Sequence, residues 1–256
     1  DTGIDGVIAA DLGVIALVRE ILPEVGIHVS TQASIVSAEA AEQYRRLGCC
    51  RAVLARELTL DEIRRIRKET TRELELEAFI HGSMCVSWSG RCLLSNHFTG
   101  RDANRGACTQ PCRWNYHVYE ISEETRPGEF LPIEESDRGT FIMSSRDMCM
   151  IGHIPELIES GIDSFKIEGR MKSPAYVYGV TKIYRRLLDE GRNATRDEMN
   201  ELSRLFSRGG FTDGYFTGRI GGDMLGVRSG KDISDSRSAG SFRASKKPEC
   251  QAVIDT

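Results

Sequence analysis

Five cysteines in the middle of the chain are the residues with the most distinctive chemistry. They fall within 65 residues of polar, Gly-rich sequence and are Cys85, Cys92, Cys108, Cys112 and Cys149. Cysteine thiolates are soft ligands that suit metal ions and iron–sulfur clusters. The alternative is a set of buried structural thiols, because free cysteine also packs as a small hydrophobic residue. The bunching of these five among 8 cysteines in 256 residues favours metal or redox chemistry.

Three further side chains are candidates for acid–base catalysis. His81 stands at the end of an expected strand, next to Gly82, where its imidazole could bind substrate or transfer a proton near neutral pH. Glu57 also follows an expected strand, although it could instead cap or pair with the next helix. Glu168 is the third candidate, and its alternative is a structural ion pair with Arg170.

Strands and helices alternate along the chain and must position these residues. Ser37 is the expected N-cap of one helix, which Gly48 ends, and Thr59 with Glu62 forms a capping-box pattern at the start of the next helix. The periodicity predicts strands over 6–11, 27–31, 51–55, 75–80, 141–143 and 164–167, and helices over 13–22, 37–47, 59 onward, 154–160 and 174–190. Such alternation predicts parallel strands joined by right-handed crossovers.

The expected fold is α/β, a TIM-like (β/α) barrel with a Cys-rich insert. Polar residues recur at the strand ends, and in a closed barrel these ends meet on one face, where active sites are built. About six strands are counted against the eight of a full barrel, so the barrel is expected to be incomplete at its N-terminus. We expect a partial barrel over 1–190 with the insert at 82–118, a rim extension over 191–226 and a disordered tail over 227–256.

Charge and hydropathy narrow the function classes. The net charge of −4 argues against a general nucleic-acid coat, although the chain has 34 Lys and Arg and could form a local basic groove between Arg91 and Arg113. No run of about 18 apolar residues is present, so no membrane partner is expected. A disulfide framework is possible for eight cysteines, but the length of the chain and the clustering of its thiols favour a reducing cytoplasm.

Three blocks of sequence closely resemble the peptidase U32 (collagenase-like) family. They are E-x-F-x-x-G-S-M-C-x-x-x-x-G-R-C-x-L-S over 77–95, N-R-G-x-C-x-Q-x-C-R-W over 104–114 and S-x-K-I-E-G-R-M-K over 164–172. The resemblance extends from about residue 6 to residue 226. The segments 125–129 and 206–215 are most similar to the branch that hydroxylates the wobble uridine of tRNA in a prephenate-dependent way.

The resemblance implies a 4Fe-4S cluster and RNA hydroxylation. The ligand order of the hydroxylase relatives corresponds to Cys85, Cys92, Cys108 and Cys149, with Cys112 in place of Cys149 as the alternative. Four thiolates complete one cubane. Prephenate is the implied oxygen-donor co-substrate and tRNA the implied partner. The alternative functions are a U32-type collagenase-like peptidase and another cluster-dependent hydroxylase.

A barrel mouth that holds a flipped-out base needs polar and basic side chains. The candidates for substrate binding are Gln32, Arg56, Arg105, Arg113, Lys166 and Arg170, with Trp114 and Tyr116 available for stacking. The arginines could equally form a solvated face.

A peptidase would need a thiolate beside a histidine, as in a pairing of Cys85 with His81. His-Glu-x-x-His and Gly-x-Ser-x-Gly are both absent from the sequence. Cys85 cannot be a cluster ligand and a free nucleophile at once, so the two functions compete for it. A pure scaffold role would predict thiols that Ser can replace without loss.

Overall fold

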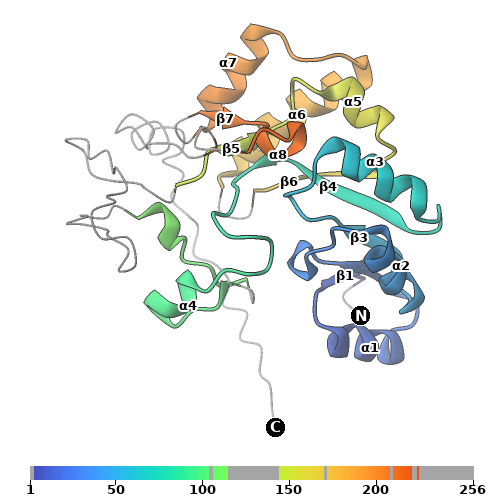
Figure 1. The fold of residues 1–256 in the computed structure, drawn as a ribbon. Helices are drawn as coiled ribbons and strands as arrows, with labels where there is room; N and C mark the ends of the chain where they lie inside the picture. The colour runs from blue at the N-terminus through green and yellow to red at the C-terminus, as the bar shows by residue number, and fades with distance from the viewer. Residues whose placement is uncertain are drawn as a thin grey trace, which may run out of the picture.

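Seven short strands form one mostly parallel sheet in the computed structural model (Figure 1). The structure describes residues 3–103, 106–114, 144–169, 172–207, 210–220 and 224. The strands are β1 (Gly6–Ala9), β2 (Gly26–Val29), β3 (Arg51–Val53), β4 (Glu75–Gly82), β5 (Asp147–Cys149), β6 (Ser164–Ile167) and β7 (Phe211–Thr212). The helices are α1 (Leu12–Ile21), α2 (Ala38–Arg46), α3 (Leu60–Glu69), α4 (Leu94–Thr99), α5 (Ile154–Glu159), α6 (Pro174–Glu190), α7 (Arg196–Leu205) and α8 (Gly214–Thr217).

Strand β4 is the centre of the sheet. Strands β1, β2, β3 and β4 lie in chain order and pair in parallel. Strand β6 pairs in parallel with β4, whereas β5 pairs with the end of β4 in the antiparallel direction and carries β7. The carboxyl ends of β2, β3, β4 and β6 therefore point the same way.

The predicted α/β class with parallel strands is confirmed, but the predicted TIM-like barrel is not. Among the described residues the sheet is open, because β1 pairs only with β2 and no strand joins it to β6 or β7. The antiparallel strand β5 also departs from the all-parallel pairing of such a barrel. Strand β5 was not predicted, and the predicted strand 141–143 lies outside the described residues.

Helix starts follow the sequence signals closely. The Ser37 hydroxyl accepts a hydrogen bond from the Ala40 backbone N–H at 3.2 Å, as expected of the N-cap of α2. At the start of α3, the Thr59 hydroxyl accepts from the Glu62 N–H while the Glu62 carboxylate accepts from the Thr59 N–H. These reciprocal bonds are the predicted capping box.

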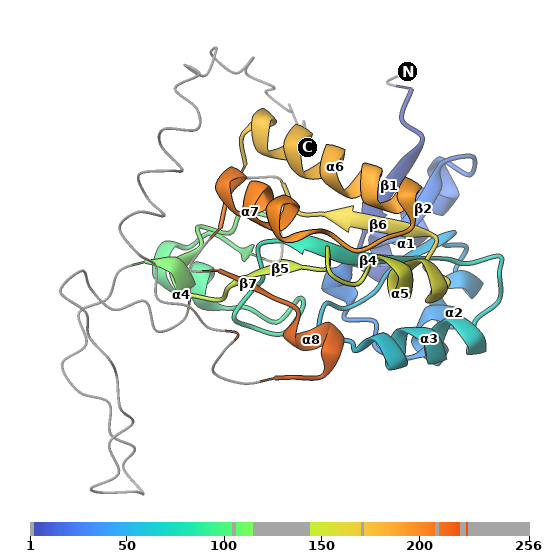
Figure 2. The ribbon, with the colours of Figure 1, turned by 90° about the horizontal axis from the view of Figure 1, so that it is seen from above.

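Apolar side chains from both sides of the sheet form one core. Figure 2 shows the strands lying between α6 and α7 on one side and α2 and α3 on the other. Val29, Leu76, Ile80 and Leu187 each expose 1% or less of their surface. In the described part of the chain, we find no helix with the length and hydropathy needed to cross a bilayer. The expected tail over 227–256 lies outside the described residues.

Candidate active site

A cavity of about 500 Å³ lies at the carboxyl ends of the parallel strands. The residues that follow these strands and line the cavity include Gln32 after β2, Arg56 after β3, Cys85 after β4 and Glu168 after β6. Parallel strands bring their carboxyl ends to one edge, so residues far apart in sequence meet there. The expected convergence of polar residues at the strand ends is confirmed for these positions.

Four thiols line this cavity. Cys85 lies three residues after the end of β4, and Cys92 lies seven residues further along the same loop. Cys108 and Cys112 come from the segment around the short 3-10 helix η3 (Pro111–Arg113). Two separate stretches of chain therefore each supply two thiols to one cavity.

The four thiols are close enough to affect one another electrostatically. Burial raises the pKa of Cys85 to about 11, and neighbouring Cys92 and Cys112 contribute to this increase. Burial also raises the pKa of Cys112, with smaller contributions from Cys108 and Cys92. Without a bound cation, Cys85 is therefore a neutral thiol at pH 7, and a positively charged centre would be needed to stabilise its thiolate.

Cys149 does not belong to this group. It lies in β5 opposite His81, and the Tyr184 hydroxyl approaches its sulfur at 3.9 Å. It is buried and does not line the cavity. The arrangement thus favours Cys112, the alternative ligand, over Cys149 as the fourth thiol beside Cys85, Cys92 and Cys108.

The four thiols fit the ligand requirement of a 4Fe-4S cluster. Within the described ranges, no three His, Cys, Asp or Glu side chains form a ready ligand group for one metal ion. In a 4Fe-4S cubane each thiolate binds a different iron, so the four sulfurs surround a core of several atoms and do not meet at one point. Four thiols around one cavity fit that requirement.

Glu57, predicted to be catalytic, anchors the loop between Cys85 and Cys92. Its buried carboxylate accepts hydrogen bonds from the Ser89 backbone N–H at 2.7 Å and from the Ser89 hydroxyl at 2.9 and 3.1 Å. Glu57 does not line the cavity. Its position supports a structural role in holding two of the thiols.

His81, the other predicted catalytic residue of this region, lies in the core. Only 1% of its surface is exposed, and burial lowers its pKa to about 3, so the imidazole is neutral at pH 7. Its Nδ1 lies 3.3 Å from the Tyr184 hydroxyl, and its ring packs against Phe211. His81 is therefore placed to stabilise the fold and does not line the cavity.

The strand pairing is irregular next to His81. In a regular strand Phe79 and His81 would face the same side, because side chains alternate with a period of two. The pairing of β4 with β6 shifts register between these two residues. Phe79 lines the cavity, whereas His81 is buried in the core.

Two predicted substrate-binding residues stand over Phe79. The guanidinium of Arg56 lies 3.9 Å from the ring centroid, and Nζ of Lys166 lies 5.5 Å from it. Arg56 also lies 3.7 Å from the carboxylate of Glu168, the third predicted catalytic residue. The positive charges of Arg56 and Lys166 thus lie over the Phe79 ring in the lining of the cavity.

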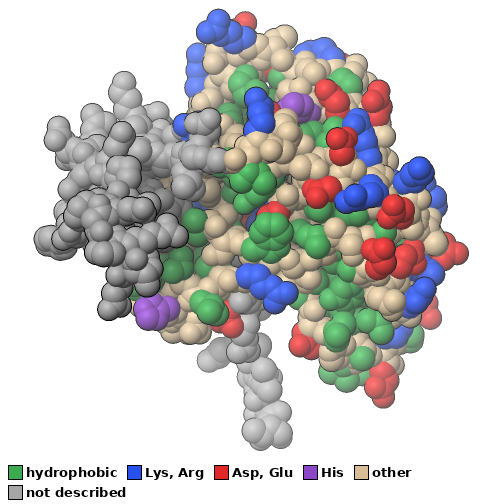
Figure 3. Space-filling model, in the orientation of Figure 1, with side chains coloured by type: hydrophobic (Ala, Val, Ile, Leu, Met, Phe, Trp, Pro, Cys, Tyr) green, Lys and Arg blue, Asp and Glu red, His purple; other side chains and the backbone are tan. Residues whose placement is uncertain are grey.

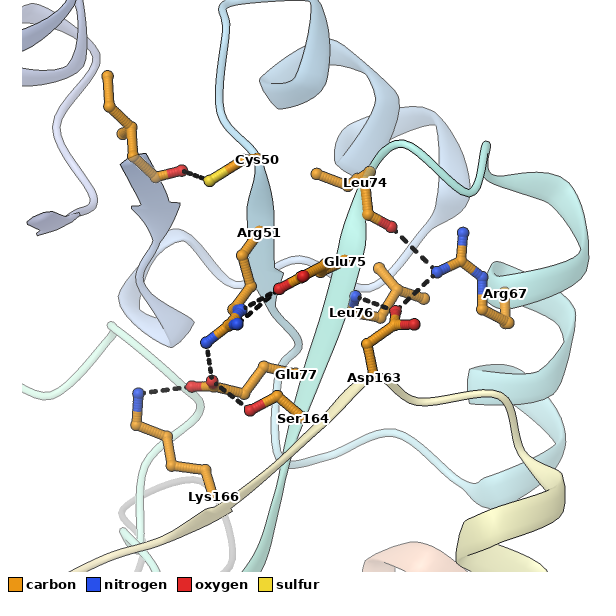
Figure 4. Close-up of polar contacts among 11 residues, drawn as sticks. Cys50, Arg51, Arg67, Leu74, Glu75, Leu76, Glu77, Asp163, Ser164 and Lys166 are labelled. Carbon is orange, nitrogen blue, oxygen red and sulfur yellow. Dashed lines mark hydrogen bonds and ion pairs between the residues drawn. The ribbon is translucent and has the colours of Figure 1, made fainter. Parts of the chain in front are cut away.

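The buried carboxylate of Glu77 orients Lys166. Figure 4 shows Arg51, Ser164 and Lys166 converging on Glu77, at 3.3, 2.9 and 2.7 Å respectively. Burial by itself raises the pKa of Glu77, but the hydrogen bond and charge of Lys166, with help from the other two, hold it below its ordinary value. Glu77 is thus ionised and keeps the Lys166 ammonium in place.

The remaining predicted binding residues differ in their positions. Gln32 lines the cavity, and its side-chain amide donates to the Ala103 carbonyl at 3.4 Å. Arg113 also lines it and donates to the Met84 carbonyl at 2.9 Å, which ties η3 to the end of β4. Arg105 and Arg170 lie outside the described residues.

The cavity has an excess of basic side chains. Arg56, Arg113, Lys166 and Lys172 line it, with Glu168 as the one acidic lining residue of the described chain. On the face seen in Figure 3, by contrast, basic and acidic side chains intermingle over the rest of the described surface. An anionic substrate group would therefore be favoured in the cavity.

A model of peptidase family U32 matches residues 1–225 of this chain. The chain belongs to this family. Its U32 relatives include "tRNA hydroxylation protein P" of Escherichia coli, 34% identical over 99% of this chain and 64% of that protein. "tRNA hydroxylation protein P1" of Bacillus subtilis is 39% identical over 92% of this chain and 56% of that protein. "Collagenase" of Porphyromonas gingivalis is 37% identical over 84% of this chain and 53% of that protein. The chain thus spans between about half and two thirds of the length of these U32 relatives.

Three residues of the U32 site were not among the predicted site residues. Phe79 packs against Arg56, Ser89 donates a hydrogen bond to Glu57, and Trp88 lines the cavity. Trp88 is a large aromatic residue between two cysteines in a short polar loop, a signal that the sequence does offer. The role of Ser89 depends on a partner 32 residues away and has no local signal.

Proposed function

We propose that this protein hydroxylates the wobble uridine of tRNA, with a 4Fe-4S cluster as its cofactor. The supporting observation is that four thiols and four basic side chains line one cavity at the strand ends. Relatives that are similar over nearly the whole chain are named tRNA hydroxylation proteins. A tRNA substrate implies a protein of the cytoplasm.

Cys85, Cys92, Cys108 and Cys112 are the proposed ligands. When bound, the cluster supplies electron transfer or Lewis-acid chemistry. Each thiol releases its proton on binding, so the affinity for the cluster falls as the pH is lowered. Burial raises the pKa of Cys85 and Cys112, so this dependence extends to higher pH than for ordinary thiols.

Arg56 and Lys166 are proposed to orient the anionic groups of the substrates. Prephenate, the proposed co-substrate, carries carboxylates that such side chains can bind. Phe79 supplies an apolar surface below both cations. The uridine must leave its stack to reach the cavity, and the basic lining favours the phosphates on either side of it.

The peptidase alternative has less support from the site. A thiolate nucleophile needs a basic partner, and the candidate pair was Cys85 with His81. His81 is buried in the core with a pKa lowered to about 3, while Cys85 lines the cavity with a raised pKa. Neither shift activates a thiol for attack.

Anaerobic purification followed by iron and sulfide analysis tests the cofactor. We expect about four of each per chain. Cys112→Ser should lose the cluster, whereas Cys149→Ser and the matched control Cys50→Ser should keep it. Loss in Cys149→Ser with retention in Cys112→Ser would overturn the proposed ligand set.

The substrate is tested by measuring hydroxylated uridine in tRNA from cells with and without the gene. We expect the modified nucleoside to disappear on deletion and to return with the wild-type gene but not with Cys112→Ser. Unchanged uridine modification after deletion would refute the tRNA assignment.

A further inference from the structure

Trp88 is an exposed aromatic residue in the lining of the cavity that contains the four thiols. It lies in the loop between Cys85 and Cys92 and exposes 51% of its surface while lining the cavity. A tryptophan side chain has a large apolar area. A ligand that covered the exposed half of Trp88 would therefore gain binding free energy from that area. The exposure of Trp88 at the cavity leaves its ring accessible to a ligand.

The loop that carries Trp88 is held rigidly by three consecutive residues. The indole N–H of Trp88 donates to the Ser34 hydroxyl at 3.1 Å. Ser89 binds the buried carboxylate of Glu57. Gly90, with φ of +72°, is pressed so closely against Gln32 that a Cβ would lie 2.1 Å from its carbonyl oxygen.

Ser34, which accepts the hydrogen bond from the Trp88 indole, has an uncommon backbone conformation. Ser34 has φ of +56°, in the left-handed region that non-glycine residues rarely occupy. It ends the short 3-10 helix η1 (Thr31–Ala33). Such conformations persist where the surrounding structure requires them and are frequent at binding sites. The hydrogen bond to Ser34 restrains the indole of Trp88 before any ligand arrives, which lowers the entropy lost on binding.

We infer that Trp88 is a platform on which a nucleobase of the RNA substrate stacks at the cavity. The inference rests on the proposed function and adds a stacking subsite to it. A tryptophan face accepts any base, and single-stranded loops are typically bound by stacking on aromatic side chains. The basic lining residues Arg56, Arg113 and Lys166 provide the complementary charge for the adjoining phosphates.

The two tryptophans of the chain, Trp88 and Trp114, allow a direct optical test. In Trp114→Phe the emission reports Trp88 alone, and in Trp88→Phe it reports Trp114 alone. Each full-length, anaerobically purified protein is titrated with an unmodified tRNA anticodon stem–loop, while the anisotropy of a label on the RNA measures binding independently. We expect saturating RNA to quench Trp114→Phe severalfold more than Trp88→Phe.

Affinities complete the test. Trp88→Ala should weaken RNA binding on the order of tenfold, whereas Trp88→Phe should stay within about threefold of the wild type, because a smaller ring still stacks. Ser34→Ala should weaken binding by about threefold, because it frees the indole. Iron content, measured on every variant, shows that the loop still holds its thiols.

The outcomes separate the inference from the proposed function. If RNA binds and Trp88 is neither quenched nor needed for affinity, the stacking subsite is refuted and the proposed function stands. If the anisotropy shows no RNA binding to the wild type, both are refuted. Quenching of Trp88 by a gelatin peptide in the absence of any RNA effect would assign the platform to a peptide and overturn the inference.

Discussion

At the scale of single residues, two buried carboxylates hold cavity residues in place although they do not line the cavity themselves. Glu57 holds the loop of Cys85 and Cys92 through Ser89, and Glu77 holds Lys166. Each carboxylate accepts hydrogen bonds from at least two donor groups, which offset the cost of its burial. Such groups orient the residues that do the chemistry, and their loss should first appear as misplacement of those residues.

Glu57→Gln should lower both stability and cluster content. The amide keeps one acceptor for the Ser89 N–H but replaces the second acceptor oxygen, which binds the Ser89 hydroxyl, by a donor, at a cost of about 1–3 kcal/mol. Urea unfolding and iron analysis measure the two effects. Ser89→Ala, which keeps the backbone hydrogen bond, should cost less than Glu57→Gln. An equal or larger loss in Ser89→Ala would contradict the anchoring role.

His81 should make folding sensitive to acid. Its pKa is about 3 in the folded protein against 6.5 for an ordinary histidine, so the unfolded chain binds one more proton between these values. The free energy of unfolding should therefore fall as the pH is lowered through this window, by about 1.4 kcal/mol per pH unit from this group.

Urea unfolding between pH 6 and pH 4.5 measures that dependence. His81→Asn cannot take up the proton, so its stability should decline less steeply than that of the wild type, by about one proton's worth of slope. Identical slopes for the two proteins would show that His81 is not buried as a neutral imidazole.

At the scale of elements, the site depends on the close approach of two loops. Gly90 brings the loop between Cys85 and Cys92, the thiol loop, against the turn that follows β2. The approach is so close that position 90 has no room for a side chain. The turn after β2 thus supports the loop after β4, just as Arg113 ties η3 to the end of β4. The cavity is built from contacts between loops that the strands hold in place.

Gly90→Ala should displace the thiol loop. The new Cβ would overlap the Gln32 carbonyl oxygen, in addition to the cost of a left-handed conformation. Gly100→Ala is a matched control, because Gly100 has a similar φ of +69° and no atom within 4 Å of its would-be Cβ. Iron content should fall in Gly90→Ala and remain in Gly100→Ala. Equal behaviour would show that the close approach does not matter for the site.

At the scale of the whole molecule, an ion pair joins segments that are distant in sequence. Asp163, just before β6, accepts hydrogen bonds from the Leu76 N–H at 2.8 Å and from Arg67 of α3 at 3.0 Å (Figure 4). Only 4% of the Arg67 side chain is exposed, and the guanidinium also donates to the Leu74 carbonyl at 3.0 Å. This cluster ties α3, β4 and β6 together.

Asp163→Asn should destabilise the entire fold. The substitution removes the negative charge that pairs with the buried Arg67 guanidinium. Complete loss of such a pair costs about 3–5 kcal/mol, and the cost is smaller if the amide oxygen of Asn still accepts a hydrogen bond. Asp61→Asn is the control, because Asp61 is 92% exposed and its pair with Arg64 at 3.4 Å should contribute at most about 0.5 kcal/mol. Both free energies come from urea unfolding. A loss in Asp163→Asn no greater than in Asp61→Asn would contradict the structural role of the cluster.

The sequence alone determined the alternation of β1 to β4 and β6 with their helices, the helix caps at Ser37 and Thr59, the family and the group of candidate thiols, because these depend on local patterns. Only the tertiary structure decided that Cys112 lies with Cys85 while Cys149 does not, that His81 is buried, and that the sheet is open over the described residues. The register shift between β4 and β6, the antiparallel strand β5 and the approach of η3 to β4 arise from pairing between distant segments. Local sequence does not specify such pairing, since the same strand can face either side after a shift of one residue.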